Sequence, residues 1–248
     1  HEEIMILGRE FKLILNKNTG CITSLEYKDF EMVKDGPFLN VWRAPTDNDI
    51  PRLAPMWRSA GLDRLRQSVK GVRLEKVSDR VVRVIVEASL HTPEGIEKFK
   101  CRYTYKVYGS SDVIIDVYVE PVSDLPPSIP RMGLKMTIPG GFEKLTWFGR
   151  GPHENYCDRK EGAAVGVYSG TVDEQYVPYI KPQENGNKTD VRWFLLTNDL
   201  GFGLLIVGMP LMEFSVHHYT IEDFEKAKHT YELKRRDDIM LNIDYKQS

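Results

Sequence analysis

Three loop-like segments hold most of the side chains that could do chemistry in this chain. They are residues 42–49 (WRAPTDND), residues 149–159 (GRGPHENYCDR) and residues 182–190 (PQENGNKTD). All three mix carboxylates with amides, and the first two add an aromatic ring. Such mixtures suit sugar recognition, because each hexose hydroxyl both donates and accepts hydrogen bonds while a ring can pack on the sugar's C–H face. Asp and Asn also brace tight turns through their own backbone, so both interpretations stay open.

If the segments face a sugar, their charged and amide residues are the candidates for contact with it. The candidate substrate-binding residues are Arg43, Asp47, Asn48, Asp49, Glu154, Asn155, Glu184 and Asn185. Glycoside hydrolysis needs two carboxylates roughly 5 to 10 Å apart across the scissile bond. Glu154 with Glu184, or Asp47 with Asp49, could be proposed as the pair of carboxylates, but the sequence cannot show that they lie at the required separation. We therefore predict no catalytic residue in this chain.

No motif indicates a metal or a cofactor. His217 and His218 are adjacent, so in a strand they point to opposite faces and cannot chelate one ion. The sequence contains no nucleophile elbow, phosphate loop or dinucleotide fingerprint. We expect neither a metal site nor a cofactor in this domain.

The charge and hydropathy of the chain exclude two classes of partner. Its 34 basic residues are balanced by 36 acidic ones with no basic stripe, which argues against a nucleic-acid partner. No apolar run approaches the roughly 20 residues that cross a bilayer, which argues against a membrane partner. We expect a soluble chain, and the sequence does not distinguish a cytoplasmic from a periplasmic location.

The dominant periodicity is two. Residues 99–107 alternate apolar and polar positions, which indicates a strand with one buried face, and the turn residues after them lead into a second strand at 113–119. Similar runs are residues 11–15, 72–74, 81–90, 132–138, 191–197, 202–207, 214–219 and 239–245. Helices are expected only near residues 56–66 and 221–228, the second opened by a capping box of Thr220 and Asp223.

This pattern predicts an all-β protein. No segment has the composition of a flexible linker, so the simplest architecture is one large antiparallel β-sandwich that spans residues 1–248 as a single domain. We also predict that the three polar segments converge at one end or face of the sandwich. There Arg43, Arg150 and Arg159 would pair with carboxylates, because an unpaired buried charge is costly.

The three segments, in this order and at comparable spacing, closely resemble the C-terminal sandwich domain of family 2 β-galactosidases, which is also called the small chain. The resemblance continues through residues 214–219 (FSVHHY) and 241–247 (LNIDYKQ), so it covers essentially the whole chain. It implies a supersandwich like that of galactose mutarotase, within a larger multidomain enzyme. The partners implied are the remaining domains of a homo-oligomeric parent β-galactosidase.

The resemblance also implies a function. The chain would be an accessory carbohydrate-binding and structural domain of a retaining β-galactosidase, whose catalytic glutamates lie in a separate barrel, so the isolated chain is expected to be inactive. In the family a closing strand and a sugar-stacking tryptophan follow the last motif, and we expect both to be missing here. Two alternatives remain: a stand-alone mutarotase-like epimerase that uses His153 or His218 with Glu184, or a carbohydrate-binding module with a platform of Trp42, Trp147 or Trp193, for which a core role is the favoured interpretation.

Overall fold

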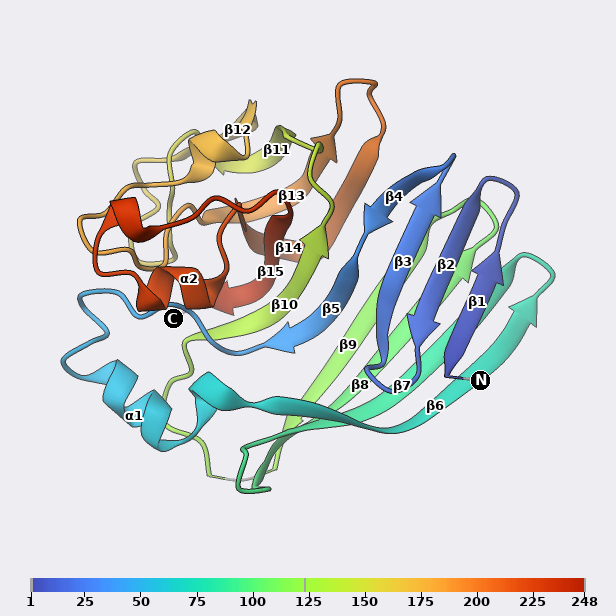
Figure 1. Ribbon diagram of the computed structural model, residues 1–248, viewed down its shortest axis with the longest axis horizontal. Coiled ribbons are helices and arrows are strands. Elements are labelled where there is room, and N and C mark those ends of the chain that lie inside the picture. The colour runs from blue at the N-terminus through green and yellow to red at the C-terminus, as the bar shows by residue number, and fades with distance from the viewer. Residues whose placement is uncertain (1, 123, 248) are drawn as a thin grey trace. The chain divides into compact units, whose positions relative to one another are not determined.

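The computed structural model describes residues 2–122 and 124–247, and it is built almost wholly of antiparallel strands (Figure 1). The chain divides into two compact units. The first is His1–Asp35 with Trp57–Pro127, and the second is Gly36–Met56 with Ser128–Ser248. In the described part of the chain, no helix has the length and apolar character that a bilayer crossing requires. The all-β, antiparallel prediction is confirmed.

The first unit contains two antiparallel sheets. One sheet has β2 between β1 and β3, with β4 paired to β3, and its strands are β1 (Glu3–Leu7), β2 (Phe11–Asn16), β3 (Cys21–Tyr27) and β4 (Phe30–Val33). The other runs in sequence order through β6 (Arg66–Ser78), β7 (Val81–His91), β8 (Glu97–Tyr108) and β9 (Val113–Pro121). Figure 1 shows these last four long strands side by side.

Alternation explains how the two sheets of the first unit face each other. Tyr103 and Tyr105 of β8 are buried, whereas Arg102 between them is exposed, as the period of two predicts. The Tyr105 hydroxyl donates to the carbonyl of Gly20 at 3.0 Å, which joins β8 to the opposite sheet. Gly20 has a φ of +73°, and a Cβ there would lie 2.6 Å from Val86 Cγ1, so glycine lets the layers approach closely.

The second unit holds the rest of the strands. Their order across the sheet is β5 (Asp35–Asn40), β10 (Arg131–Ile138), β15 (Ile239–Gln247), β14 (Gly203–His217), β13 (Lys188–Thr197), β11 (Lys144–Gly151) and β12 (Ala164–Thr171). The runs expected separately at residues 202–207 and 214–219 belong to one long strand, β14, which continues through irregular pairing with β13.

Aromatic side chains fill one side of this sheet. The Phe194 ring stacks on Phe214 with centroids 4.2 Å apart, and Trp147 meets the edge of Phe214 at 6.4 Å. Trp42 is also buried, and its indole N–H donates to Glu225 at 3.1 Å. Trp193 differs, because it is only half-buried and lies on the opposite side of β13 from Phe194. The core role expected for the three tryptophans therefore holds for Trp42 and Trp147 and was wrong for Trp193.

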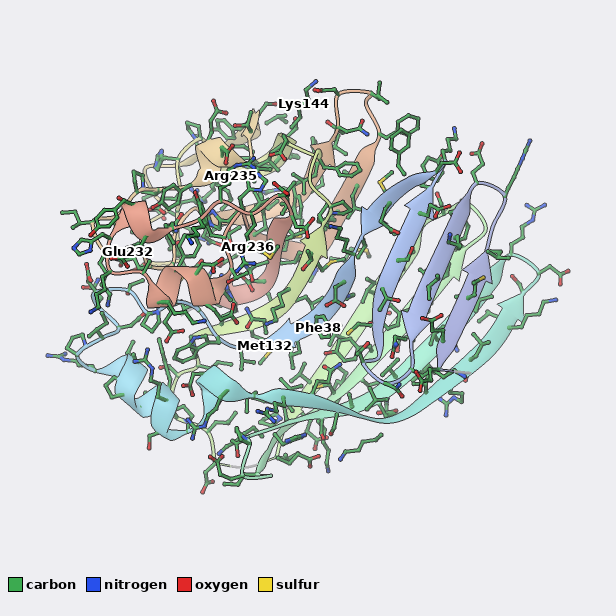
Figure 2. The ribbon with its side chains drawn as sticks, in the orientation of Figure 1. Phe38, Met132, Lys144, Glu232, Arg235 and Arg236 are labelled. Atoms are coloured by element: carbon green, nitrogen blue, oxygen red, sulfur yellow. The ribbon has the colours of Figure 1, made fainter. Side chains whose placement is uncertain are left out.

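The helices are short connections, as expected. They are α1 (Leu53–Ser59), α2 (Ile221–Lys226) and the 3-10 turns η1 (Leu62–Arg64), η2 (Asp173–Gln175) and η3 (Thr230–Glu232). The helix expected over residues 56–66 begins earlier and stops before Gly61, whose φ of +79° breaks the helical conformation. At α2 the capping box of Thr220 and Asp223 is confirmed, and Arg236, labelled in Figure 2, adds a two-pronged ion pair to Asp223 at 2.6 and 2.8 Å.

Candidate functional site

All three polar segments lie in the second unit. The first of these segments, residues 42–49, folds around a buried ion pair. The Arg43 guanidinium donates from Nε and Nη2 to the two carboxylate oxygens of Asp49, at 3.1 and 2.9 Å. The Asp49 carboxylate also accepts the backbone N–H of Thr46 at 2.9 Å. The two side chains are 7% and 3% exposed, so this forked pair is shielded from water.

Between the partners of this pair, the chain turns outward and exposes Asp47 and Asn48. Asp47 is tied to the third segment, because its N–H donates to Gln183 Oε1 at 3.1 Å and its carboxylate accepts Gln183 Nε2 at 3.2 Å. The backbone N–H of Glu184 donates to the carbonyl of Ala44 at 3.1 Å. The first and third segments are thus held together by side-chain and backbone bonds.

Glu154 of the second segment is anchored from three directions. Its Oε1 accepts from the Tyr179 hydroxyl and from Arg159 Nη2, the latter at 2.9 Å, and its Oε2 accepts the Gly186 N–H at 2.8 Å. Burial alone would raise the pKa of Glu154, but the hydrogen bonds from Tyr179, Gly186 and Arg159 outweigh it and lower that pKa below its ordinary value. Glu154 is therefore held as a carboxylate.

Asn155 joins the second segment to β13. Its side-chain oxygen accepts the Thr189 N–H at 2.9 Å and the Thr189 hydroxyl at 2.6 Å, and its amide donates to the carbonyl of His153 at 3.0 Å. Its backbone N–H donates to Asn187 O at 2.8 Å, and Asn187 Nδ2 returns a bond to Asn155 O at 3.0 Å. Asn155 is completely buried, so these bonds satisfy a side chain that water does not reach.

Asn185 has a similar role in the third segment. Its side-chain oxygen accepts the Val177 N–H at 3.1 Å, and its amide donates to Gln183 O at 2.9 Å. Its backbone carbonyl lies 2.9 Å from His217 Nε2. A carbonyl can only accept, so the His217 Nε2 carries the proton, and burial lowers the pKa of this imidazole to about 4. His217 is thus a neutral, buried side chain that holds the backbone of the third segment by a hydrogen bond.

Glu184 belongs to a buried cluster that lies around Arg131. Arg131 is completely buried, with Nη2 2.9 Å from Glu184 Oε1 and Nε 3.0 Å from Asp244 Oδ2. Gln247 Nε2 donates to Asp244 at 3.3 Å, and Glu213 lies close enough to influence the same carboxyl. We call Arg131, Glu184, Glu213, Asp244 and Gln247 the Arg131 cluster.

The Arg131 cluster has more carboxyls than cations, and its proton affinities reflect that. Burial raises the pKa of Asp244 to about 7, against the attraction of Arg131 and with the repulsion of Glu184 and Glu213. Burial likewise raises the pKa of Glu213, against a hydrogen bond from Asn187. Asp244 and Glu213 therefore both hold a proton more tightly in the folded chain than in water.

Lys188, at the start of β13, is a further buried cation of the unit. Its Nζ donates to Gly186 O at 3.0 Å and lies 5.3 Å from the centroid of the Trp147 ring. Burial lowers the pKa of Lys188 to about 8, against the attraction of Glu154. Lys188 therefore joins the third segment to the aromatic core of the unit.

The three arginines of the polar segments pair with carboxylates, as predicted. Arg43 pairs with Asp49 and Arg159 with Glu154, while Arg150 Nε lies 2.5 Å from Asp190, which also holds Lys160 at 3.2 Å. The predicted convergence of the three segments is confirmed within the second unit. Arg131 was missed, because it stands alone after a proline and belongs to none of the segments.

Sequence reasoning also missed most of the acidic side of the cluster. The sequence did hold a signal for Asp244, because Asn242 and Asp244 are two residues apart in a predicted strand and so share one face. The structure shows that both are buried. His218, proposed as an epimerase acid with Glu184, instead lies 2.8 Å from Glu143, while Glu184 is bound to Arg131. No group of three or more His, Cys, Asp or Glu side chains is placed to hold a metal ion within residues 2–122 and 124–247.

The comparisons with known sequences point to one family. The profile of the family described as "Beta galactosidase small chain" matches residues 7–248. The chain is 38% identical to a β-galactosidase of Priestia megaterium, an alignment that covers 99% of this chain and 23% of that protein. It is 39% identical to a β-galactosidase of Vibrio cholerae, over 92% of this chain and 22% of that protein. The chain therefore spans about a quarter of the length of these relatives.

One solved structure shows a similar fold. A galactose mutarotase-like protein from Lactobacillus casei superposes with a TM-score of 0.51 at 12% sequence identity, over 99% of this chain and 89% of that one. At so low an identity the likeness concerns the fold alone. It confirms the predicted galactose mutarotase-like sandwich.

Proposed function

Because this chain belongs to the β-galactosidase small-chain family, we propose that it serves as an accessory, non-catalytic region of a longer β-galactosidase. The parent polypeptide would hydrolyse terminal β-D-galactosides with retention of configuration, using carboxylates that lie outside these 248 residues. The small-chain region would shape one wall of the sugar site and stabilise the assembly.

One observation carries the non-catalytic part of this proposal: the carboxylates of Asp49, Glu154 and Glu184 are each bound within the protein. Asp49 is bound by Arg43 and Glu184 by Arg131, with the acidic side chains 3% and 5% exposed. Glu154 is more accessible, but its pKa is lowered. A general acid for glycoside hydrolysis needs a raised pKa and contact with the leaving group, so these residues suit anchoring better than proton transfer.

The same bonds suggest how the candidate binding residues divide their roles. Asp47 and Asn48 are exposed at a turn, where polar side chains can meet sugar hydroxyls. Arg43, Asp49 and Glu184 hold that turn in place from beneath, through the Arg43–Asp49 pair and the bond of the Glu184 N–H to Ala44. We propose that the exposed pair touches the galactoside, and that the buried residues contribute by fixing the shape of the surface.

Hydrolysis of a chromogenic β-galactoside tests the non-catalytic role. The 248-residue chain should give no turnover, whereas the longer polypeptide that contains it should be active and should release the β-anomer first, as read by proton NMR. Turnover by the isolated chain that Glu154→Gln or Glu184→Gln abolishes would overturn the proposal.

A second measurement tests the contact with sugar. In the longer polypeptide, Asp47→Ala combined with Asn48→Ala should raise KM by about ten-fold, since one or two lost hydrogen bonds are worth about 1 to 2 kcal/mol. The matched control is Asp79→Ala, an exposed carboxylate of the first unit that pairs with the exposed Lys76. An unchanged KM in the double variant would remove Asp47 and Asn48 from the sugar site.

A further inference from the structure

One face of the sheet in the second unit is apolar and exposed. Phe148 of β11 stands opposite Val167 of β12 and Trp193 of β13, and Trp193 in turn stands opposite Val207 of β14. Directly paired residues of antiparallel strands point to the same face. The side chains of four neighbouring strands therefore form one continuous line, which we call the apolar row: Val167, Phe148, Trp193 and Val207.

The apolar row is wider than a single line. Leu195 and Leu205 are also paired, two residues along from Trp193 and Val207, so they extend the face on the same side. Val167, Leu205 and Val207 are 62%, 57% and 59% exposed. Contiguous exposed apolar side chains of this kind mark interaction sites more often than isolated ones do.

The other face of the same strands is already covered. Trp147 and Phe194, the strand neighbours of Phe148 and Trp193, are 2% and 0% exposed and pack with Phe214. Strands with apolar residues on both faces are typical of sheets that have a layer on each side. In the second unit, the aromatic core described above covers the face of Trp147 and Phe194, whereas the face of Phe148 and Trp193 is not covered by that core.

The surroundings of the apolar row have the composition of a protein interface. The Arg192 guanidinium lies 5.3 Å from the centroid of the Phe148 ring, and Phe148 and Trp193 meet edge to face at 6.3 Å. Along one border, Arg150 and Lys160 pair with Asp190. Interfaces typically combine an apolar centre rich in aromatic rings and arginine with a polar rim.

We propose that the apolar row, with Leu195 and Leu205, is the docking surface for another region of the longer polypeptide. This inference rests on the proposed function. The length of the relatives supports another region of the same polypeptide as the partner that covers this surface, since about three quarters of each relative lies outside the aligned part. Six apolar side chains are far fewer than the roughly 20 to 30 residues a side of a stable interface between separate chains. A tethered partner needs less surface, because the linkage raises its effective concentration.

Thiol labelling in the longer polypeptide and in the 248-residue chain tests this assignment. Val207→Cys is introduced into a Cys157→Ser background, because Cys157 is exposed whereas Cys21 and Cys101 are buried. The matched control is Tyr118→Cys on β9 of the first unit, a position 62% exposed against 59% for Val207. The two introduced thiols should react at similar rates in the 248-residue chain. In the longer polypeptide, the Val207→Cys thiol should react at least about ten-fold more slowly, because labelling then requires local opening. The Tyr118→Cys thiol should keep its rate.

Each other occupant gives its own result, and each would overturn the proposal. Equal labelling of Val207→Cys in both polypeptides leaves the surface without a partner. Slow labelling in the 248-residue chain that speeds up on dilution assigns the surface to a second copy, and slow labelling at every concentration shows that the chain covers its own surface. Protection by galacto-oligosaccharides assigns it to a sugar.

Hydrolysis by the same longer polypeptide separates this inference from the proposed function. An active enzyme whose Val207→Cys thiol stays reactive refutes the docking surface alone. A protected thiol in a polypeptide that does not hydrolyse β-galactosides refutes the function alone.

Discussion

In the first unit the largest fully buried side chains are apolar or aromatic, whereas the second unit also buries Arg131 and Lys188. Both units are antiparallel β-structures, yet they are stabilised by different interactions. Apolar contacts in the first unit depend little on pH or on the identity of one partner. The buried charge of Arg131 stabilises the second unit only while it keeps its counter-charges, because an unpaired buried charge costs several kcal/mol. We expect the two units to respond differently to substitution and to pH.

The largest effect is expected at Arg131. Arg131→Met keeps the length of the side chain but leaves Glu184 and Asp244 buried without their cation, so the free energy of unfolding should fall by about 3 to 5 kcal/mol. Urea denaturation followed by tryptophan fluorescence measures this. The control Arg102→Met removes an exposed pair with Glu87 and should cost less than about 1 kcal/mol.

A companion variant sharpens the result at Arg131. Adding Glu184→Gln and Asp244→Asn to Arg131→Met removes the stranded charges and should recover part of the loss. If the triple variant is no more stable than Arg131→Met alone, then packing rather than charge explains the effect.

Arg43→Ala should follow, with a loss of about 3 kcal/mol, since it strands the single buried carboxylate of Asp49. The same denaturation experiment separates scaffold from surface. A loss near or below about 1 kcal/mol would mean that the Arg43–Asp49 pair is effectively solvated, and that the first segment is a surface rather than a support.

In the first unit, Leu15→Ala should cost about 2 to 5 kcal/mol through the cavity that it leaves. This loss should be the same at pH 5 and pH 8, because no ionisable partner is involved. A loss that varied strongly with pH would break the contrast between the two units.

A smaller effect is expected from the proton on Asp244. Its pKa is raised to about 7 in the folded chain, against about 4 when unfolded, so the folded state binds the proton more tightly. The stabilisation from this proton is fully present below about pH 4 and is lost as the pH rises through 7. The difference in unfolding free energy between the unsubstituted chain and Asp244→Asn should therefore fall by about 2 kcal/mol from pH 5 to pH 7.

His217→Gln provides a control of opposite sign. Burial lowers the pKa of His217 to about 4, so its contribution is present above its unfolded pKa of about 6.5 and is lost as the pH falls toward 4. Its difference curve should rise with pH where that of Asp244→Asn falls. Two curves with the same slope would contradict the protonation states assigned here.

The smallest effect is expected at Arg159. Its side chain is 51% exposed, and Glu154 keeps its bonds from Tyr179 and Gly186 when Arg159 is replaced. Arg159→Ala should therefore lower the free energy of unfolding by less than about 1 kcal/mol in the same urea assay. A loss comparable to that of Arg131→Met would show that exposed and buried ion pairs of the second unit contribute equally to stability, contrary to our expectation.

The sequence by itself determined the class of the fold and the family. Alternation at residues 99–107 predicts β8 because strand side chains change faces at every residue, and the Thr220 capping box predicts the start of α2 because its bonds are local. The three polar segments supported the family resemblance, which the sequence profile confirms over residues 7–248. The assignment of residues 1–248 to a single domain and the direct contact with sugar remain predictions.

Only the tertiary structure decided which charges meet. Periodicity tells which face a side chain occupies, but not which distant strand lies beside it, so nothing in the sequence paired Arg131 with Glu184 and Asp244. For the same reason the polar segments could not be divided into buried supports and exposed turn residues. Whether Trp193 faced the core or solvent also depended on the side of β13 that the rest of the unit covers. Long-range neighbours are set by how strands assemble, and they decide the burial, the pKa and the role of each of these side chains.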